Sequence, residues 1–162
     1  MKEIELPQHN SYAIVDDADY DKLKTYSWSR SGRGDVVAWD KGNNKLVKMH
    51  RLIMEAPPNV EVDHINRNPL DNRRDNLRYC NSSQNKCNRL KQHNNKSGYK
   101  GVSWHKQRKK WTVRCGHHGK HHYIGLFDDK EDAARAYDAA ARRLHGDFAQ
   151  LNFPDQVPPM SI

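Results

Sequence analysis

A short polar segment, residues 91–97, divides this sequence into two blocks with different patterns. The segment is basic and contains no aliphatic side chain. Only 35% of the 162 residues are hydrophobic and the mean hydropathy is −1.10, so one large core is not expected. The sequence therefore predicts two small domains, residues 1–90 and residues 98–154, with a linker at 91–97 and a tail at 155–162.

Charge is distributed unevenly along the chain, whose net charge is +8. Residues 1–40 hold five basic and eight acidic side chains. By contrast, the 52 residues between Asp75 and Asp128 hold twelve Lys and Arg and no acid. An ordinary solvated surface mixes both signs, so an acid-free run of this length predicts a surface that binds a polyanion. Double-stranded DNA is the expected partner, and no small-molecule substrate is expected.

Several classes of protein are not indicated. No run of 18 apolar residues is present, so no membrane-spanning helix is expected. The first residues are not followed by the apolar segment of a signal peptide, and a cytoplasmic location is predicted. Cys80, Cys87 and Cys115 are odd in number and form no CxxC pair. Neither a disulfide framework nor a zinc finger is indicated, and reduced, partly buried thiols are expected.

The first block predicts a mixed α/β segment followed by a strand–loop–strand–helix unit. A strand is expected at residues 12–15, a short helix at 16–26, and a hairpin whose strands are 36–39 and 46–49. The second part, residues 59–90, contains strands at 60–65 and 76–80 around a loop rich in Asn, Arg and Pro. A helix follows, capped by Ser82 and extending from Ser83 to about Leu90.

The C-terminal block predicts a three-stranded antiparallel sheet packed on one helix, which makes the chain α+β. The strands are expected at 99–105, 110–116 and 123–127, and the helix is expected between a cap at Asp128 or Asp129 and a stop at Gly146. Alternation along the strands assigns two faces. The helix-packed face is predicted to hold Trp111, Val113, Cys115, Ile124 and Leu126, and the opposite face Thr112, Arg114, His121 and Tyr123.

Four residues of the first block have the chemistry of a nuclease. Hydrolysis of a phosphodiester needs a base for water and positive charge for the phosphorane and the leaving oxygen. His64 can act as the base near neutral pH, and Asn76 can accept its imidazole N–H and fix its tautomer. Asp63 and the Asn85 amide offer the oxygen donors that Mg²⁺ or Mn²⁺ prefers. Because Asp63 and His64 are adjacent on a strand end, they should point to opposite sides, one to the metal and one to the water.

Residues 62–78, continuing to Ser83-Gln-Asn85, resemble the HNH nucleases of the ββα-metal fold, in particular the phage and intron-encoded homing endonucleases. The resemblance implies that His64 is the general base, that Asn76 orients it, and that Asp63 and Asn85 bind one divalent metal. Residues 49–53 are also typical of that family, and His50 is expected to have a structural or phosphate-contact role. Because the last ligand is Asn85 rather than a histidine, zinc is not expected at this centre.

The C-terminal block resembles the AP2/ERF DNA-binding domain at residues 97–102, 123–127, 133–138 and 151–154. The resemblance implies that the sheet enters the major groove. The positions that match the contacts of that family are Lys100, Ser103, His105, Arg114, His121 and Tyr123. Several arginines of the family are replaced here, by Ser103, Gly116 and His121, so a target sequence is not implied.

Alternative interpretations remain for single residues and for the whole chain. Four asparagines are interpreted as turn formers rather than ligands, namely Asn66, Asn68, Asn72 and Asn81. His117, His118, His121 and His122 could bind a transition metal, although phosphate contact at the rim of a hairpin is favoured. The basic run 106–110 is likewise interpreted as a phosphate contact. The main alternative function is a DNA-binding regulator with an inactive nuclease scaffold, and an RNA-binding protein is a more distant one.

The form of the product is predicted from the number of sites. One chain offers one His64 and one metal site, which is enough to cut one strand. No apolar heptad or long exposed hydrophobic stripe suggests a dimer. The sequence therefore predicts a monomer that nicks one strand near a long, asymmetric site.

Overall fold

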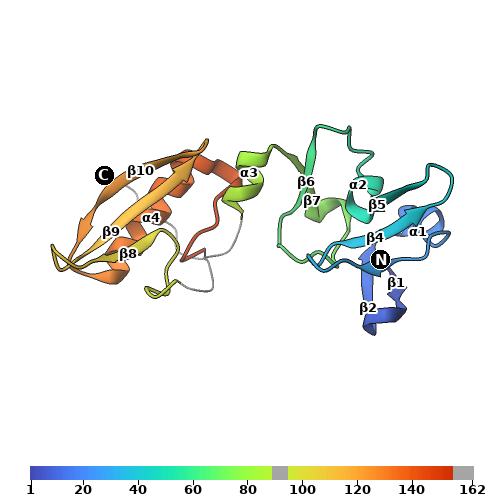
Figure 1. Ribbon diagram of the computed structural model, residues 1–162, viewed down its shortest axis with the longest axis horizontal. Helices are drawn as coiled ribbons and strands as arrows, with labels where there is room; N and C mark the ends of the chain where they lie inside the picture. Colours follow the sequence, from blue (N-terminus) through green and yellow to red (C-terminus); the bar gives the residue numbers. More distant parts are fainter. Residues whose placement is uncertain (89–94, 155–162) are drawn as a thin grey trace. The chain divides into compact units, whose positions relative to one another are not determined.

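The computed structural model describes residues 1–88 and 95–154, which form two compact units, Met1–Ser82 and Ser83–Ile162. Each unit has its own hydrophobic core, as the low apolar content requires. The chain is α+β, with small antiparallel sheets in both units and a three-stranded sheet packed on a helix in the second (Figure 1), which confirms the predicted fold class. None of the described helices is long and apolar enough to cross a bilayer.

The first unit begins with two small antiparallel sheets. Its elements are β1 (Lys2–Leu6), η1 (Pro7–His9), β2 (Ser11–Val15), α1 (Asp17–Leu23), β3 (Ser29–Arg30), β4 (Val36–Asp40) and β5 (Lys45–Lys48). The predicted hairpin is confirmed as β4 and β5, and its turn is held by Asp40, whose carboxylate accepts from Gly42 N and Asn43 N. The helix is shorter than predicted. The indole of Trp28 donates to the Leu23 carbonyl at 2.8 Å, which fixes the chain as it leaves the helix.

The second half of this unit carries the predicted nuclease motif. It consists of α2 (Met49–Ile53), β6 (Glu61–His64), η2 (Arg74–Asn76) and β7 (Leu77–Cys80). β6 and β7 pair antiparallel, with His64 opposite Leu77 and Asp63 opposite Arg78. Val62 and Leu77 pack into the same core as Leu6, Leu23 and Met49, which anchors the motif to the N-terminal sheets.

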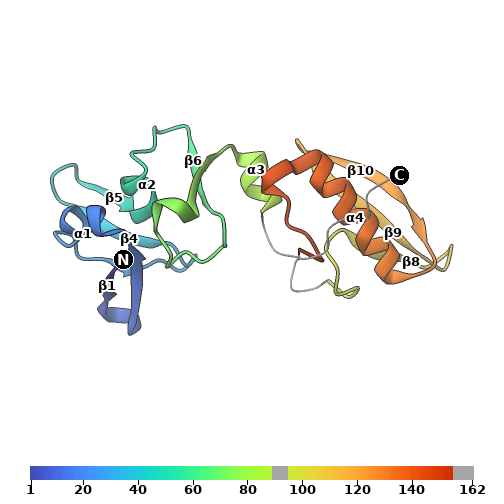
Figure 2. The same cartoon turned by 180° about the vertical axis from the view of Figure 1, so that it is seen from behind.

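The second unit is a sheet covered by a helix. It contains α3 (Ser82–Cys87, whose first residue closes the first unit), β8 (Val102–His105), β9 (Lys110–His117), β10 (Lys120–Phe127), α4 (Lys130–His145) and η3 (Gly146–Phe148). The strand order is β10-β9-β8, and α4 lies along one face of the sheet (Figure 2). Asp129 caps α4 by accepting from Glu131 N and Asp132 N, and Gly146 ends it with a φ of 54°. Both predicted helix boundaries are therefore confirmed.

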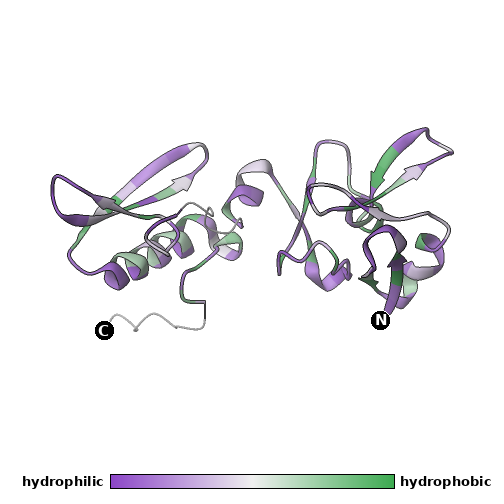
Figure 3. Ribbon diagram, turned by 60° about the horizontal axis from the view of Figure 1, so that its bottom comes forward, coloured by the Kyte–Doolittle hydropathy of each residue, from purple (hydrophilic) through white to green (hydrophobic). Residues whose placement is uncertain are grey.

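Small side chains let α4 approach the sheet closely. Ala133, Ala134, Ala140 and Ala141 are buried against strands β8 to β10. Along α4, hydrophobic and hydrophilic bands follow one another in Figure 3. Gly101 has a φ of 76°, and a Cβ there would lie 2.1 Å from the Tyr137 ring. Position 101 therefore requires glycine for both its backbone conformation and its contact with α4.

One predicted face assignment is wrong, and a β-bulge is the reason. The register between β9 and β10 shifts between Tyr123 and Gly125. Beyond the bulge Leu126 pairs with Thr112 and Phe127 with Trp111, so the alternation is inverted relative to an unbroken strand. Phe127, rather than Leu126, packs with Ile124 against the helix-side core.

The ends of the predicted linker and domain can be followed only in part. Residues 91–94, the end of the predicted helix at Leu90 and the tail at 155–162 lie outside the described residues. Ser97 is buried, and its hydroxyl lies 2.8 Å from the Val102 carbonyl. At the other end, Asn152 N and Phe153 N donate to the buried carboxylate of Asp138. Residue 97 therefore belongs to the packed structure of the second unit rather than to a free linker.

Candidate nuclease centre and nucleic-acid interface

Asp63 and His64 end strand β6, and both side chains are buried. The partner of Asp63 across the hairpin is Arg78, whose Nε and Nη2 donate to Asp63 Oδ2 at 3.2 and 3.0 Å. A carboxylate held by a guanidinium keeps a fixed position and carries oxygen donors of the kind that a hard cation prefers. The strand therefore presents a carboxylate and an imidazole on adjacent residues.

The His64 imidazole is held by an asparagine and by a second histidine. Its Nε2 lies 3.3 Å from Asn72 Oδ1, and because a carbonyl oxygen only accepts, Nε2 carries the proton and Nδ1 the lone pair. The His50 ring of α2 meets the His64 ring edge to face, 4.9 Å between centroids. Burial lowers the pKa of His64, and the hydrogen bond to Asn72 opposes this shift. A neutral imidazole at pH 7 is the protonation state that a general base needs.

His50 is a buried, uncharged support for this imidazole. Burial, and then the proximity of His64, lower the pKa of His50 to about 3. Its Nδ1 has no hydrogen-bond partner among the described residues. Such a ring cannot contact a phosphate while it stays buried. The structure therefore favours the structural role over the phosphate contact that was the other expectation for His50.

Asn76 has a different partner from the one predicted. Its amide oxygen accepts from Asn66 N at 2.9 Å, and its amide nitrogen donates to Asn66 Oδ1 at 2.9 Å and to the Asp71 carbonyl at 2.7 Å. These bonds close the loop between β6 and β7. The hydrogen bond that orients His64 comes from Asn72 instead, so Asn76 shapes the loop that positions Asn72.

The loop between the two strands is braced by its own asparagines, as predicted. Asn66 Oδ1 accepts from Asn68 N at 2.8 Å, and Asn68 Oδ1 accepts from Leu70 N at 3.1 Å. Asp71 is buried and accepts a bidentate pair from Arg73 at 2.8 and 2.7 Å, which lowers the Asp71 pKa. These bonds hold the loop between β6 and β7 in one conformation.

The N-terminal residues give this loop a second support. Ile14 N donates to the Leu70 carbonyl at 2.7 Å, and Asn72 N donates to the Ile14 carbonyl at 2.8 Å, so β2 is stitched to the loop. Arg74 forms a bidentate pair with Asp19, at 2.8 Å for both bonds. The carboxylate of Asp16 also accepts a hydrogen bond from Arg74 N. Two acidic side chains of the negatively charged N-terminal region therefore hold the end of this loop through Arg74.

The fourth predicted residue of the nuclease set, Asn85, lies on α3, which belongs to the second compact unit except for its first residue. The structure therefore gathers Asp63, His64 and Asn76 in the first unit and places Asn85 in the other. The assignment of Asp63 and Asn85 as ligands of one metal stays a prediction.

The exposed face of the β10-β9-β8 sheet, in the second unit, carries most of the predicted DNA-contacting residues. Arg114 and Tyr123 are exposed and face each other across β9 and β10. His121 lies two residues before Tyr123, and Ser103 pairs with Thr112 of β9, so all four share the face opposite α4. The sheet thus presents cationic, aromatic and hydroxyl groups together.

Two predicted contact residues make bonds within the protein. Lys100 Nζ donates to the Cys87 carbonyl at 2.6 Å, at the end of α3. His105 Nδ1 lies 3.4 Å from Arg108 N in the turn after β8. A hollow of about 1040 Å³ in the second unit is bordered by basic side chains, among them Lys86, Lys96 and Lys120. The acid-free run thus lines one surface of this unit.

Sequence reasoning missed three residues of the nuclease centre. The sequence does not single out Arg78, although pairing β6 with β7 in register places it opposite Asp63. It indicates only a turn former at Asn72, and nothing in the spacing from His64 indicates the hydrogen bond. His50 is part of the sequence motif, but its burial against His64 depends on how α2 packs.

The geometry defines a chain with a nuclease-like His and Asp on a β-hairpin and a separate three-stranded sheet of the DNA-binding type. The comparisons agree. The HNH endonuclease family matches residues 47–87, and the AP2 domain family matches residues 97–147. The chain belongs to the HNH endonuclease family and carries a C-terminal AP2 domain.

Relatives of known sequence include viral and plant proteins. Protein 3.8 of Escherichia phage T7 is 32% identical over 75% of this chain and 92% of its own length. An HNH endonuclease of Acanthamoeba polyphaga mimivirus is 30% identical over 88% of this chain and 75% of its own length. An ethylene-responsive transcription factor of Arabidopsis thaliana is 41% identical over 41% of this chain and 34% of its own length. The viral relatives span both parts of the chain, whereas the plant protein shares one region.

Proposed function

We propose that this protein is a site-directed, metal-dependent DNA endonuclease of the homing type that nicks one strand. The observation that carries the proposal is the buried His64, which is held by Asn72 and is adjacent on one strand to Asp63, the partner of Arg78. In this proposal the protein acts as a monomer in the cytoplasm of a cell that hosts a phage or mobile element. The AP2 domain binds double-stranded DNA and selects the site.

The residues of the chain have distinct tasks in this proposal. His64 accepts a proton from water at Nδ1, because Nε2–H is already donated to Asn72. Asn76 keeps the loop in the shape that presents Asn72. His50 excludes water from the far side of the imidazole, since its ring is buried against it. Arg78 holds the Asp63 carboxylate in place and contributes positive charge beside it.

The donor set fits a hard divalent cation. A Mg²⁺ or Mn²⁺ ion bound by Asp63 and Asn85 would supply positive charge for the phosphorane and the leaving oxygen. Asp63 offers a carboxylate that is paired with Arg78, and Asn85 offers an amide oxygen. Both are oxygen donors, which favours these ions over zinc.

The DNA-binding regulator with an inactive scaffold is the less favoured function. A scaffold that only holds the AP2 domain does not need a buried neutral imidazole with an oriented tautomer. The match of residues 47–87 to the HNH endonucleases also favours the nuclease. The deciding experiment is cleavage of supercoiled plasmid by the purified protein with Mg²⁺ and with excess chelator. Cleavage only with the metal supports the nuclease, and DNA binding without any cleavage supports the regulator.

The product is expected to be a nick at a fixed position. One chain carries one His64 and one Asp63, so cutting both strands requires two-fold symmetry or a second binding event. A duplex with the target site, labelled on each strand in turn, should show one cut strand when the protein is monomeric by light scattering. Equal cutting of both strands by a stable dimer would contradict this prediction and leave the nuclease assignment intact.

DNA affinity is expected to depend on the exposed sheet face and on salt. Replacing Arg114 by alanine should weaken binding about tenfold or more, the usual worth of one contact that discriminates a base. For about four phosphate contacts, the affinity of the wild type for DNA should also fall about 10²-fold between 50 and 200 mM salt through counterion release.

Fluorescence anisotropy with labelled duplex measures both the effect of Arg114→Ala and the effect of salt. Arg143→Ala is the matched control, because Arg143 is exposed on α4 and loses the same charge. Equal weakening by both variants would show that the sheet face has no special role.

A further inference from the structure

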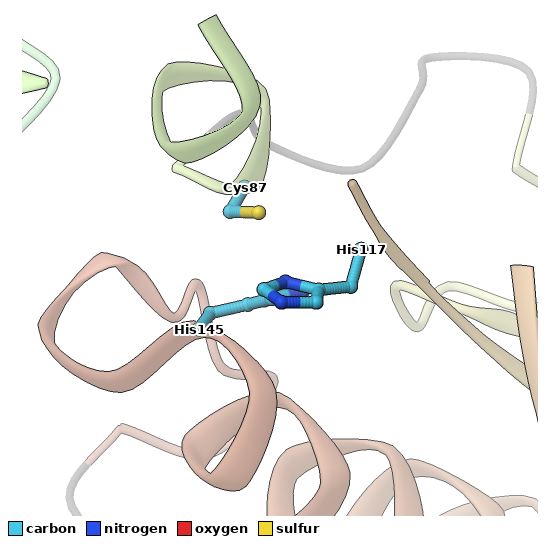
Figure 4. Close-up of side chains that lie close together, drawn as sticks. All are labelled: Cys87, His117 and His145. Carbon is cyan, nitrogen blue, oxygen red and sulfur yellow. The ribbon is translucent and has the colours of Figure 1, made fainter. Parts of the chain in front are cut away.

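We propose that Cys87, His117 and His145 form a transition-metal site, best suited to Zn²⁺, within the second unit. One ligand atom from each of these residues lies within 4.8 Å of the other two. Figure 4 shows Cys87 at the end of α3 facing the imidazoles of His117, from the end of β9, and His145, from the end of α4. The site is separate from the Mg²⁺ or Mn²⁺ centre proposed for the nuclease.

The distances are close to those of a bound ion. A tetrahedral zinc site with Zn–S of about 2.3 Å and Zn–N of about 2.0–2.1 Å spaces its ligand atoms about 3.3–3.7 Å apart. The three atoms here lie within 4.8 Å of one another and need to approach by at most about 1.5 Å, which side-chain rotation can supply. Thiolate and imidazole are the ligands of zinc and related ions, whereas Mg²⁺ and Ca²⁺ take oxygen. The donor set therefore selects a transition metal.

The hydrogen bonding of His145 leaves one buried ring nitrogen that a metal ion could bind. His145 Nε2 lies 2.8 Å from the Gly116 carbonyl and must donate to it, so Nδ1 carries the lone pair. Metal-binding histidines almost always donate their other ring N–H to such a partner. Yet His145 Nδ1 is buried and has no hydrogen-bond partner among the described residues. A metal ion would satisfy an atom that otherwise costs free energy to bury.

His117 shows the same unsatisfied atom. Its Nδ1 is also buried without a hydrogen-bond partner among the described residues, and its ring stacks on that of His145 with 5.7 Å between centroids. Each histidine thus has a buried ring nitrogen without a partner among the described residues, in the same cluster as the Cys87 thiol.

The fourth coordination position is open to water. Cys87, His117 and His145 all border the hollow of about 1040 Å³ in this unit, which is open to solvent. A three-residue site of this kind binds an ion and one water molecule. The hollow also explains how the ion would enter.

The site would fasten α3 to the AP2 domain. α3 already contacts this unit through Lys100, which donates to the Cys87 carbonyl, and through Ser83, whose Oγ accepts from His118 N at 3.2 Å. An ion bound by Cys87, His117 and His145 would link α3 to β9 and α4. This link would be a third and stronger contact for a helix of only six residues. The helix that carries Asn85 would then be fixed by an ion on the DNA-binding side.

Metal content of the full-length chain tests the proposal. Protein purified under reducing conditions is loaded with Zn²⁺, passed through a desalting column and analysed by mass spectrometry of the metal. We expect one Zn²⁺ per chain in the wild type. In the stripped protein, Co²⁺ should produce the thiolate-to-metal charge-transfer band of a Cys ligand. Cys87→Ser should remove this band and the zinc, and His117→Ala should weaken zinc binding by about 10²-fold or more, since removing even an outer partner costs 10–100-fold.

Two matched variants keep the result specific. Cys80→Ser removes another buried free thiol, one in the first unit, and should leave both signals unchanged. Asp63→Asn alters the nuclease centre and should also retain the zinc, so failure of the nuclease proposal and failure of this one are distinguishable. Circular dichroism confirms that each variant is folded. The proposal is overturned if the folded wild type holds no zinc and gives no charge-transfer band, or if Cys87→Ser retains them.

Discussion

Replacing His64 by alanine is expected to lower DNA cleavage by about 10²-fold or more, the usual contribution of a general base. The imidazole is buried, its Nε2–H is donated to Asn72 and its Nδ1 carries the lone pair. Among the described side chains of the β6–β7 hairpin, His64 is the one that combines these features of a general base. DNA binding should be retained, because the exposed sheet face belongs to the other unit. The measurement is the single-turnover cleavage rate on an end-labelled duplex, with affinity from gel shift.

A matched control separates the loss of this base from the loss of any histidine. His9 is exposed at the end of η1, and His9→Ala should cleave like the wild type. Asn72→Ala should fall between the two, because it leaves the imidazole in place but removes the bond that fixes its tautomer. Full cleavage by His64→Ala would reject the assignment, and loss of DNA binding together with cleavage would indicate misfolding.

Much of the second unit could be predicted from sequence because its signals are local. The cap at Asp129, the stop at Gly146 and the buried alanines of α4 each depend on residues within a few positions. The bulge after Tyr123 could not be predicted. An extra residue in a strand is recognised only from the register with the partner strand, and the alternation of apolar and polar residues does not give that register.

The nuclease centre shows the same limit. Its residue types and spacing gave the hairpin, the loop and the pair Asp63 and His64. The partners of these residues come from long-range packing. Asn72 is positioned near His64 by two interactions of the loop with the N-terminal region. These are the backbone hydrogen bonds between the loop and Ile14 of β2, and the ion pair between Arg74 and Asp19. The metal site proposed for the second unit is similarly hidden, since Cys87, His117 and His145 are far apart in sequence and only His117 belongs to the histidine cluster that the sequence indicates.

Replacing Asp63 by asparagine is expected to reduce metal-dependent cleavage by more than about 10²-fold, because loss of an outer partner of a metal ligand alone costs 10–100-fold. The substitution removes the carboxylate charge that the cation requires and leaves the shape of the side chain nearly unchanged. It also leaves Arg78 without its ion-pair partner at this position, so thermal unfolding must be measured alongside activity.

The metal dependence decides between loss of a ligand and loss of the fold. If Asp63 binds the ion, the residual activity of Asp63→Asn should need far more Mg²⁺ or Mn²⁺ than the wild type needs, while affinity for DNA stays the same. Asp21→Asn is the control, because Asp21 is exposed on α1 and pairs only with the neighbouring Lys24 among the described ion pairs. Wild-type cleavage at the same metal concentration by folded Asp63→Asn would show that this carboxylate is no ligand. The ion pair with Arg78 would then be its whole role, a structural brace across the two strands that carry His64.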